Sequence, residues 1–278
     1  MHKEYTDHQP KGISQVHRAL LARLHRNFKG TFTSREAADC LGLPAKKANR
    51  LFAHWASRGW LSRIRRGMYI TVPLDAINPS EWRVDPWLIA DALFAPCYIG
   101  GWSAAEYWGL TEQIFNDIVV FTSGGTRRRS HEVKGTRFIV ISVPVKRITD
   151  FKTVWRDDLR VKVSSPARTV IDILDKPELG GGIRHAAQIT VEFFQGEHSD
   201  HFSILSILES WKNKSVCKRL GFIIETFDLD APAVLAYCCA NVSSGYSRLD
   251  PSIGRKGTLL RKWMLEVNAT LGTESLSE

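Results

Sequence analysis

Residues 31–70 have the sequence TFTSREAADCLGLPAKKANRLFAHWASRGWLSRIRRGMYI, in which two short helical patterns precede a basic segment. Thr33 and Glu36 have the spacing of a capping box, which marks the start of a helix. Gly42 can adopt the left-handed conformation that ends this helix, and Pro44 suits the first turn of the next one. The pattern therefore predicts a helix-turn-helix.

The second of these helices, over residues 45–58, has two chemically different faces. Its apolar residues recur at helical spacing and form one buried stripe, namely Ala48, Leu51, Phe52 and Trp55. Its polar residues fall on the opposite side, namely Lys46, Lys47, Asn49, Arg50 and His54. An apolar back holds a helix rigid, while cations and an amide can contact phosphates and base edges. This division is typical of a DNA-recognition helix.

A basic hairpin, the wing, is predicted after this helix. Two short apolar strands surround Arg65-Arg66-Gly67, and Arg63 lies beside them. Such a hairpin can reach the phosphate backbone or a minor groove. Helix, turn, helix and basic hairpin in this order predict a winged helix-turn-helix that binds DNA. Two alternatives are a protein–protein module of the same fold and a helical subdomain with a solvated basic face.

An earlier helix is predicted over residues 14–28, because Val16, Leu20, Leu24 and Phe28 recur at every fourth position. The polar residues 1–12 before it resemble a tail. With 278 residues, the chain is long enough for two ordinary domains. Three prolines among polar residues place a linker at residues 73–85. The predicted domains are residues 1–75, the winged helix-turn-helix, and residues 82–278.

The C-terminal domain is predicted to be mixed α/β, with sheet and helices in residues 82–165 and mostly helices in residues 166–278; the whole chain is α+β. Strands are expected at residues 97–99, 118–122, 138–143, 159–163 and 263–267. Helices are expected at residues 87–94, 103–109, 166–174, 183–194, 202–211, 216–227 and 232–240. Ser103 and Glu106 suggest a second capping box, and Ser165 with Pro166 suggests another helix start. The glycines at 180–182 suggest a flexible break.

The charge is unevenly distributed. Residues 1–73 hold 14 Lys+Arg and 4 Asp+Glu, a net of +10, although the whole chain has a net charge of +9. Residues 127–168 form a second basic segment, with 12 Lys+Arg and 4 Asp+Glu. A basic N-terminal domain fits a nucleic-acid partner, whereas the second basic segment requires an explanation of its own.

Four segments of the chain resemble the AbiEi antitoxin family of abortive-infection systems. They are CYIGGWSAAEYWGL at 97–110, VSSPARTVIDIL at 163–174, CKRLGFIIE at 217–225 and the wing ending RGMYI at 66–70. The resemblance implies a transcriptional repressor that binds inverted repeats in its own operator and takes part in phage defence. It also implies a C-terminal domain that counters a nucleotidyltransferase-like toxin, without a stable complex being required.

Carried onto this sequence, the resemblance places the DNA-binding residues on two helices and the wing: Ser34, Lys46, Lys47, Asn49, Arg50, Arg63, Arg65 and Arg66. Ser34 is included because it stands at a helix N-terminus, which suits a phosphate. Trp102, Tyr107 and Leu110, within the family segments, are expected in the core rather than at an interface.

The second basic segment contains TSGGTRRRSHEVKGTR, residues 122–137, which is predicted to be a loop between two strands. Its cations are Arg127, Arg128, Arg129, Lys134 and Arg137. One hypothesis is a second DNA contact that bends the operator, and another is a docking patch for the toxin. The third interpretation is a solvated loop without a partner.

Enzymatic alternatives have weaker support. Asp117 with Glu132 and Lys134 loosely resembles a metal-dependent nuclease, but Glu132 and Lys134 fall in a polar loop. Asp228 and Asp230 resemble a nucleotidyltransferase metal motif, but Asp230 is better explained as the cap of the helix that begins near Pro232.

The histidines His131, His185, His198 and His201 lack the spacing of a metal site. The prediction is therefore a protein that is not an enzyme, with no metal and no cofactor. The five cysteines are scattered without a CxxC pair, which indicates a reducing compartment. No signal peptide or membrane span is evident, so a cytoplasmic location is expected. The alternative function is a ligand-responsive or dimerising winged-helix repressor without a toxin partner, in which residues 202–211 would be the dimerising helix.

Overall fold

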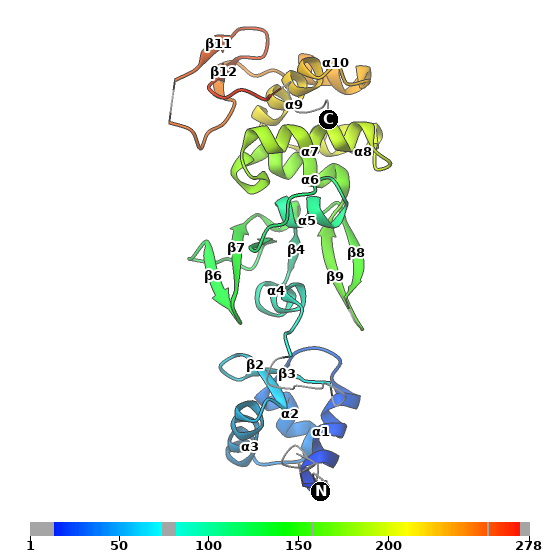
Figure 1. The fold of residues 1–278 in the computed structure, drawn as a ribbon, viewed down its shortest axis with the longest axis vertical. Helices are drawn as coiled ribbons and strands as arrows, with labels where there is room; N and C mark the ends of the chain where they lie inside the picture. The colour runs from blue at the N-terminus through cyan, green and yellow to red at the C-terminus, as the bar shows by residue number, and fades with distance from the viewer. Residues whose placement is uncertain (1–13, 74–81, 157, 255, 273–278) are drawn as a thin grey trace, which may run out of the picture. The chain divides into compact units, whose positions relative to one another are not determined.

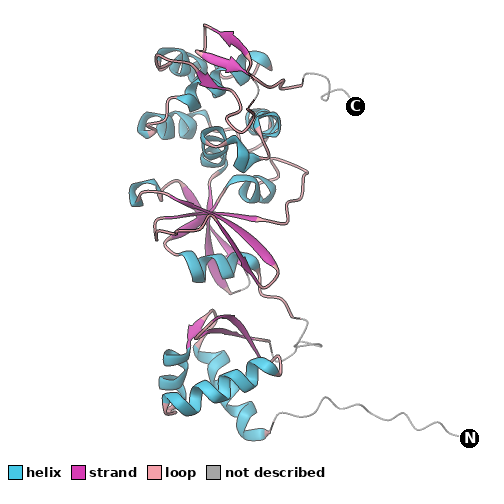
Figure 2. Cartoon of the chain, turned by 90° about the vertical axis from the view of Figure 1, so that its left-hand side faces the viewer, coloured by secondary structure: helices cyan, strands magenta, loops and turns pink. Residues whose placement is uncertain are grey.

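The computed structural model describes residues 14–73, 82–156, 158–254 and 256–272 (Figures 1 and 2). The chain folds as two units. The first comprises Met1–Leu88 with Asp157–Leu159, and the second comprises Ile89–Arg156 with Arg160–Glu278. The predicted tail and most of the predicted linker lie outside the described residues. None of the described helices is both long and apolar enough to cross a membrane.

The first unit has the element order of a winged helix-turn-helix. Its elements are α1 (Gln15–Asn27), β1 (Phe32–Thr33), α2 (Ser34–Leu41), α3 (Ala45–Ser57), β2 (Leu61–Arg65) and β3 (Met68–Thr71). The three strands form an antiparallel sheet in the order β1-β3-β2. The predicted fold class is confirmed, and β1 is an addition to it, since a two-residue strand leaves almost no pattern in a sequence.

The core of the first unit lies between the three helices and the sheet. Leu21 and Leu24 of α1 are fully buried in it, whereas Val16 is 68% exposed. The predicted stripe at every fourth position is therefore wrong at its first residue. A helix turns once in 3.6 residues, so each four-residue step rotates the stripe by about 40° and carries Val16 out of the core.

The local signals around α2 are confirmed. The Thr33 N–H donates to Glu36 Oε2 at 2.7 Å, and the Glu36 N–H donates to Thr33 Oγ1 at 3.2 Å, which completes the capping box. Gly42 ends the helix with a φ of 66°. These contacts connect only close neighbours, so they follow directly from the order of residues.

The second unit contains a six-stranded mixed sheet in the order β6-β7-β5-β4-β9-β8. Its strands are β4 (Cys97–Ile99), β5 (Ile118–Thr122), β6 (Ser130–Val133), β7 (Thr136–Ser142), β8 (Phe151–Arg156) and β9 (Leu159–Ser164). The expected strands at 97–99, 118–122, 138–143 and 159–163 are confirmed. The two edge strands, β6 and β8, are additional, because they carry exposed polar residues that resemble loops in the sequence.

Helices lie on both sides of this sheet, with α4 on one side and α5 to α10 on the other (Figures 1 and 2). The helices are α4 (Pro86–Phe94), α5 (Gly101–Tyr107), α6 (Pro166–Asp175), α7 (Ile183–Gln195), α8 (His201–Ser210), α9 (Ser215–Thr226) and α10 (Pro232–Ala240). Short 3-10 helices, η1 (Val145–Arg147) and η2 (Pro177–Gly180), connect neighbouring elements. The predicted helices agree with these within a few residues.

Three features of the predicted C-terminal domain are wrong. Ser103 does not cap α5, which begins at Gly101; instead its hydroxyl accepts the Val119 N–H at 3.0 Å. Gly180–Gly182 form a turn bridged by the Gly182 N–H and the Pro177 carbonyl at 2.8 Å, not a flexible break. The predicted final strand at 263–267 is shorter: Trp263 lies in a turn, and β12 (Leu265–Val267) pairs with β10 (Ser247–Arg248) and β11 (Thr258–Leu260).

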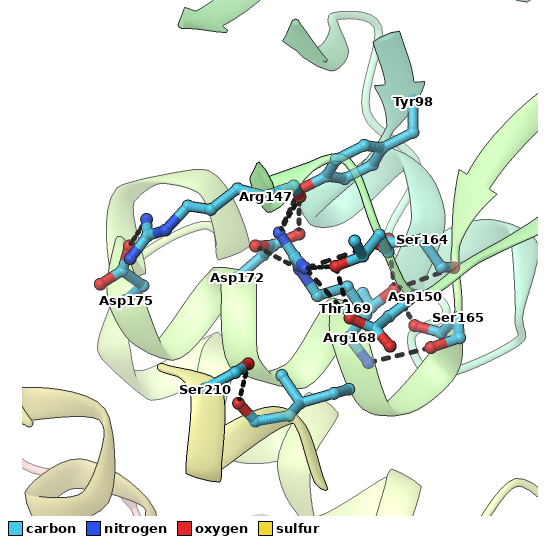
Figure 3. A network of polar contacts seen from close by, with 12 residues as sticks. Tyr98, Arg147, Asp150, Ser164, Ser165, Arg168, Thr169, Asp172, Asp175 and Ser210 are labelled. Atoms are coloured by element: carbon cyan, nitrogen blue, oxygen red, sulfur yellow. Dashed lines mark hydrogen bonds and ion pairs between the residues drawn. The ribbon is translucent and has the colours of Figure 1, made fainter. Parts of the chain in front are cut away.

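A buried polar network joins the sheet to α6 (Figure 3). Arg168 donates from Nε to Asp172 Oδ1 at 3.0 Å and from Nη2 to Tyr98 Oη at 2.8 Å. The Tyr98 hydroxyl donates in turn to Asp172 Oδ2 at 2.9 Å. Every member has a partner, as buried charges require, and the network fixes α6 against β4.

Buried cations on α9 hold the C-terminal segment in a similar way. Arg219 donates to the carbonyls of Leu174, Arg248 and Leu249 at 2.7 to 3.0 Å, and Lys218 donates to the Gly245 carbonyl at 2.6 Å. Burial lowers the pKa of both cations, and backbone oxygens replace the water that they have lost. The CKRLGFIIE segment at 217–225 is therefore structural at these two positions.

Candidate nucleic-acid interface

Helix α3 presents the predicted polar face. Ala48, Phe52 and Trp55 are completely buried, and the Phe52 ring lies 6.0 Å from the ring of Tyr69 on β3. The predicted DNA-reading residues of the helix are all exposed: Lys46, Lys47, Asn49 and Arg50. Because the opposite face is locked into the core, these side chains are carried on a rigid support.

The turn before α3 differs slightly from the expected one. Pro44 is the N-cap of α3 rather than a residue of its first turn. The Lys47 and Ala48 N–H groups both donate to the Pro44 carbonyl, at 2.9 and 3.0 Å. The N-terminal turn of α3 therefore begins directly after the loop from α2, as in the second helix of a helix-turn-helix.

The wing is a short hairpin made of β2 and β3. Leu61 and Ile64 point into the core, whereas Arg63, Arg65 and Arg66 are exposed. An irregularity in the strand register lies between Arg63 and Arg65. Arg63 and Arg65 lie on either side of the buried Ile64, and Arg66 lies in the turn, so all three cations are at or near the tip of the hairpin.

Ser34 begins α2 and contacts the wing instead of being free. Its N–H donates to the Gly67 carbonyl at 2.8 Å, and Gly67 has a φ of 76°. The Ser34 backbone donor is therefore unavailable to a phosphate. Glu36 in the same turn is ionised, because hydrogen bonds from the Thr33 backbone and hydroxyl hold its pKa below the usual value. This end of α2 is a weaker anion site than expected, although the Ser34 hydroxyl is half-exposed.

Arg58 is a further exposed cation, at the C-cap of α3, that the sequence pattern did not single out. His54 is also exposed, and its ring lies 6.1 Å from the Trp60 ring and 6.4 Å from the His17 ring. These residues extend the polar face of α3 toward its C-terminus. His54 was already part of the predicted polar face, and the position of Arg58 about two turns after Arg50 is the signal that could have found it.

The prediction that residues 122–137 form one loop is wrong, because Ser130–Val133 form strand β6. Arg127, Arg128 and Arg129 are exposed before β6, and their side chains form no ion pair with a described residue. Lys134 lies in the β6–β7 turn, with a φ of 54°. The four residues of β6 separate the three arginines from Lys134 by about 13 Å. Arg137 is already paired, since its Nε donates to Asp117 Oδ2 at 2.7 Å.

The metal motifs considered in the sequence are used structurally. Asp117 binds Arg137, and Glu132 stands opposite Arg137 in the β6–β7 ladder. Asp230 does not cap α10, whose N-cap is Ala231 without a side-chain hydrogen bond, so that expectation is wrong. Across the described ranges, no group of three or more His, Cys, Asp or Glu side chains is arranged to hold a metal ion.

Three residues of the family segments, Trp102, Tyr107 and Leu110, were predicted to lie in the core. Leu110 is buried, and Trp102 is half-buried, with its indole N–H donating to the Asp117 carbonyl at 2.7 Å. Tyr107, however, is 40% exposed, so its prediction as a core residue is wrong. It lies at the last position of α5, where the helix surface leaves the core.

One known family is similar to part of the first unit. Residues 19–72 match the family model described as "Transcriptional regulator, AbiEi antitoxin". These residues are similar to AbiEi antitoxins. The match contains α2, α3 and the whole wing, including the RGMYI ending, and it covers about a fifth of the 278 residues. It confirms the resemblance to AbiEi antitoxins where the candidate interface lies, while the three C-terminal segments fall outside it. No curated protein matches the sequence.

Proposed function

We propose that this protein is an antitoxin and transcriptional regulator that binds double-stranded DNA through α3 and the wing. The observation that carries the proposal is the pairing of an exposed Lys46-Lys47-Asn49-Arg50 face with an exposed Arg63-Arg65-Arg66 wing on one rigid domain. Side chains of α3 can read base edges in a major groove, and the wing can contact phosphates. The description of the matching family, a transcriptional regulator and antitoxin, supports this interpretation.

The target we propose is the protein's own operator, with paired inverted repeats, so that the protein represses its own synthesis. In the same operon we expect a nucleotidyltransferase-like toxin that this protein counteracts, with or without direct contact. Both statements rest on the AbiEi resemblance. The charge of the first 73 residues, +10, agrees with a DNA-binding role for that domain.

A second DNA contact is proposed for Arg127, Arg128 and Arg129 alone. Their three exposed guanidinium groups are free of ion pairs with described residues, so all three charges are available to phosphates. Lys134 and Arg137 are left out of this contact, because one lies at the far end of the hairpin and the other is neutralised by Asp117.

The alternative is a repressor that dimerises through α8. One observation favours it: Phe202, in the first turn of α8, is 82% exposed, although Ile204, Ile207 and Leu208 of the same helix are buried. A tight dimer in a solution mass measurement would support this alternative, and a monomer would oppose it. No enzymatic activity is proposed.

The experiment that tests the proposed function is a nuclease footprint of the full-length chain on the DNA directly upstream of its gene. Protection of two inverted repeats would support an autoregulating DNA-binding protein. If no DNA is protected at low salt, the first unit acts as a protein-binding module and the proposal is wrong.

A further inference from the structure

Strand β8 (Phe151–Arg156) is an exposed edge of the six-stranded sheet. It follows β9 at the end of the strand order, and no other described strand pairs with its outer side (Figure 1). Alternate residues of an edge strand direct their N–H and C=O groups away from the sheet, where another strand can pair with them. The edge is six residues long, or about 20 Å, which is enough for a regular strand.

Large apolar side chains are exposed beside this edge. Trp155 of β8 is 62% exposed. Phe202, at the start of α8, is 82% exposed and borders a hollow of about 500 Å³. The hollow is also lined by Phe151 and Lys152 of β8 and by Pro166 at the start of α6. Trp155 does not line this hollow, so the two exposed rings lie at separate places beside the free strand edge, and exposed aromatic rings of this size are typical of protein-binding surfaces.

Three cations flank the same edge without forming an ion pair, although Asp200 lies close enough to Lys152, and Asp91 to Lys162, to interact with them electrostatically. The Arg160 guanidinium lies 4.7 Å from the Trp155 ring centre, and the Lys162 ammonium lies 4.5 Å from that of Phe151. Lys152 lies on β8 itself and is exposed. None of the three forms an ion pair with another residue in the described part of the chain, so they present a net positive strip along the edge.

We propose that β8 is a docking edge to which a partner protein adds an acidic, extended segment as a seventh strand. Main-chain hydrogen bonds to β8 would supply affinity. Carboxylates of the segment would face Lys152, Arg160 and Lys162, and an apolar side chain near its end would enter the hollow beside Phe202. From Lys152, which lines the hollow, to Trp155 the strand rises by about 10 Å. An added strand of four to six residues is therefore long enough to reach from the hollow to Trp155.

A protein segment suits this surface better than a nucleic acid does. Asp158, after β8, and Glu197, at the rim of the hollow, have side chains that are 73% and 88% exposed. These carboxylates would repel a phosphate backbone that followed the strip, whereas a peptide can place cations or neutral residues opposite them. The inference goes beyond the proposed DNA-binding function and does not depend on it.

The test is selection of binding peptides from a random twelve-residue display library on the immobilised full-length chain. The expected peptides alternate acidic with aromatic or β-branched residues. A synthetic copy of one should slow amide hydrogen exchange in residues 151–156, which reports pairing at this edge. The double substitution Arg160→Glu with Lys162→Glu should weaken its binding by about tenfold or more, because two attractive contacts become repulsive.

Two controls make the result specific. Lys146→Glu removes an exposed cation of η1, outside the strip, and should leave peptide binding unchanged. Trp155→Ser keeps every charge and should still weaken binding, which covers the case in which the charge reversal disturbs folding. The inference is overturned by an absence of enriched peptides, by enriched peptides without acidic residues, or by protection outside β8. It is equally overturned if a 20-base-pair duplex protects β8 and displaces the peptide, which would make the strip a nucleic-acid surface.

Discussion

Arg168 and Asp172 form an ion pair in the interior of the second unit, with Nε and Oδ1 3.0 Å apart and side chains only 1% and 2% exposed. Tyr98 donates to the same carboxylate, and the Arg147 carbonyl accepts from Arg168 Nη2 at 2.9 Å. Burial raises the pKa of the Asp172 carboxyl to about 6, and Arg168 opposes this shift, so the carboxylate is ionised above neutral pH. Both residues lie on α6, and their hydrogen bonds with Tyr98 of β4 link this helix to the sheet that carries the proposed docking edge.

Asp172→Asn should destabilise the second unit by about 3 kcal/mol at pH 7.5, because it removes the buried counterion of Arg168. The remaining carboxylate partner, Asp150, is 40% exposed and lies 3.5 Å from Arg168 Nη1. Urea denaturation of the full-length chain measures this loss. Asp158→Asn, at an exposed carboxylate, is the matched control and should change stability by less than about 0.5 kcal/mol. Replacing the pair together, Arg168→Met with Asp172→Leu, should cost less than Asp172→Asn alone. Equal effects of the Asp172 and Asp158 substitutions would show that the buried pair is not important for stability.

His185 should make the second unit sensitive to mild acid. Burial lowers its pKa below the ordinary histidine value of 6.5, and its ring lies 2.7 Å from both the Gly180 carbonyl and the Thr111 hydroxyl. As the pH falls through about 6.5, the unfolded chain binds a proton before the folded chain does, so the unfolding free energy decreases. Thermal melts between pH 8 and pH 5 should show a smaller decrease in melting temperature for His185→Gln than for the wild type. Parallel curves for the two proteins would contradict this account.

Gly221→Ala should destabilise the protein even though alanine is the better helix former. Gly221 lies within α9, and a Cβ there would overlap the indole ring of Trp263. The gain in helix propensity is about 1 kcal/mol, whereas overpacking in a rigid core costs about 1–3 kcal/mol or more. A lower denaturation midpoint is therefore expected. Gly254→Ala is the control, since open space surrounds that position, and a stabilised Gly221→Ala protein would show that Trp263 moves aside easily.

Much of the fold follows from local sequence signals. The capping box of Thr33 and Glu36, the Gly42 terminus and the apolar stripe of α3 each involve residues within a few positions of one another. The α3 and wing cations could be found for the same reason, because an exposed face is the complement of a buried stripe.

Other features depend on residues that are distant in the sequence. Nothing near Arg168 indicates that Tyr98, 70 residues earlier, completes its shell of hydrogen bonds. Ser103 and Glu106 have the spacing of a capping box, yet α5 begins two residues earlier, at Gly101, which has a positive φ. The Ser103 hydroxyl is therefore inside the helix and accepts a hydrogen bond from Val119 of β5. The edge strand β8 resembles a loop because only Val154 is buried, and its strand conformation comes from pairing with β9.

Arg127, Arg128 and Arg129 should contribute to DNA affinity if the second unit touches the operator. Changing all three to Glu should weaken binding and reduce the dependence of affinity on salt, by about 0.9 in the logarithmic slope for each phosphate contact that is lost. A salt titration of operator binding measures both effects. Lys134→Glu, at the opposite end of the β6–β7 hairpin, serves as the control. An unchanged slope in the triple variant would remove the proposed second contact.

The measurement that tests the central claim most directly is a salt titration of the full-length chain on the duplex upstream of its gene. It compares the wild type with Arg50→Ala and with Arg65→Ala/Arg66→Ala, and Arg23→Ala on α1 is the charge-matched control. We expect Arg50→Ala to reduce the preference for this duplex over unrelated DNA by about tenfold or more. We expect the wing variant to lower affinity for all duplexes and to reduce the salt slope. If both variants bind as the Arg23 control does, then α3 and the wing do not form the DNA interface.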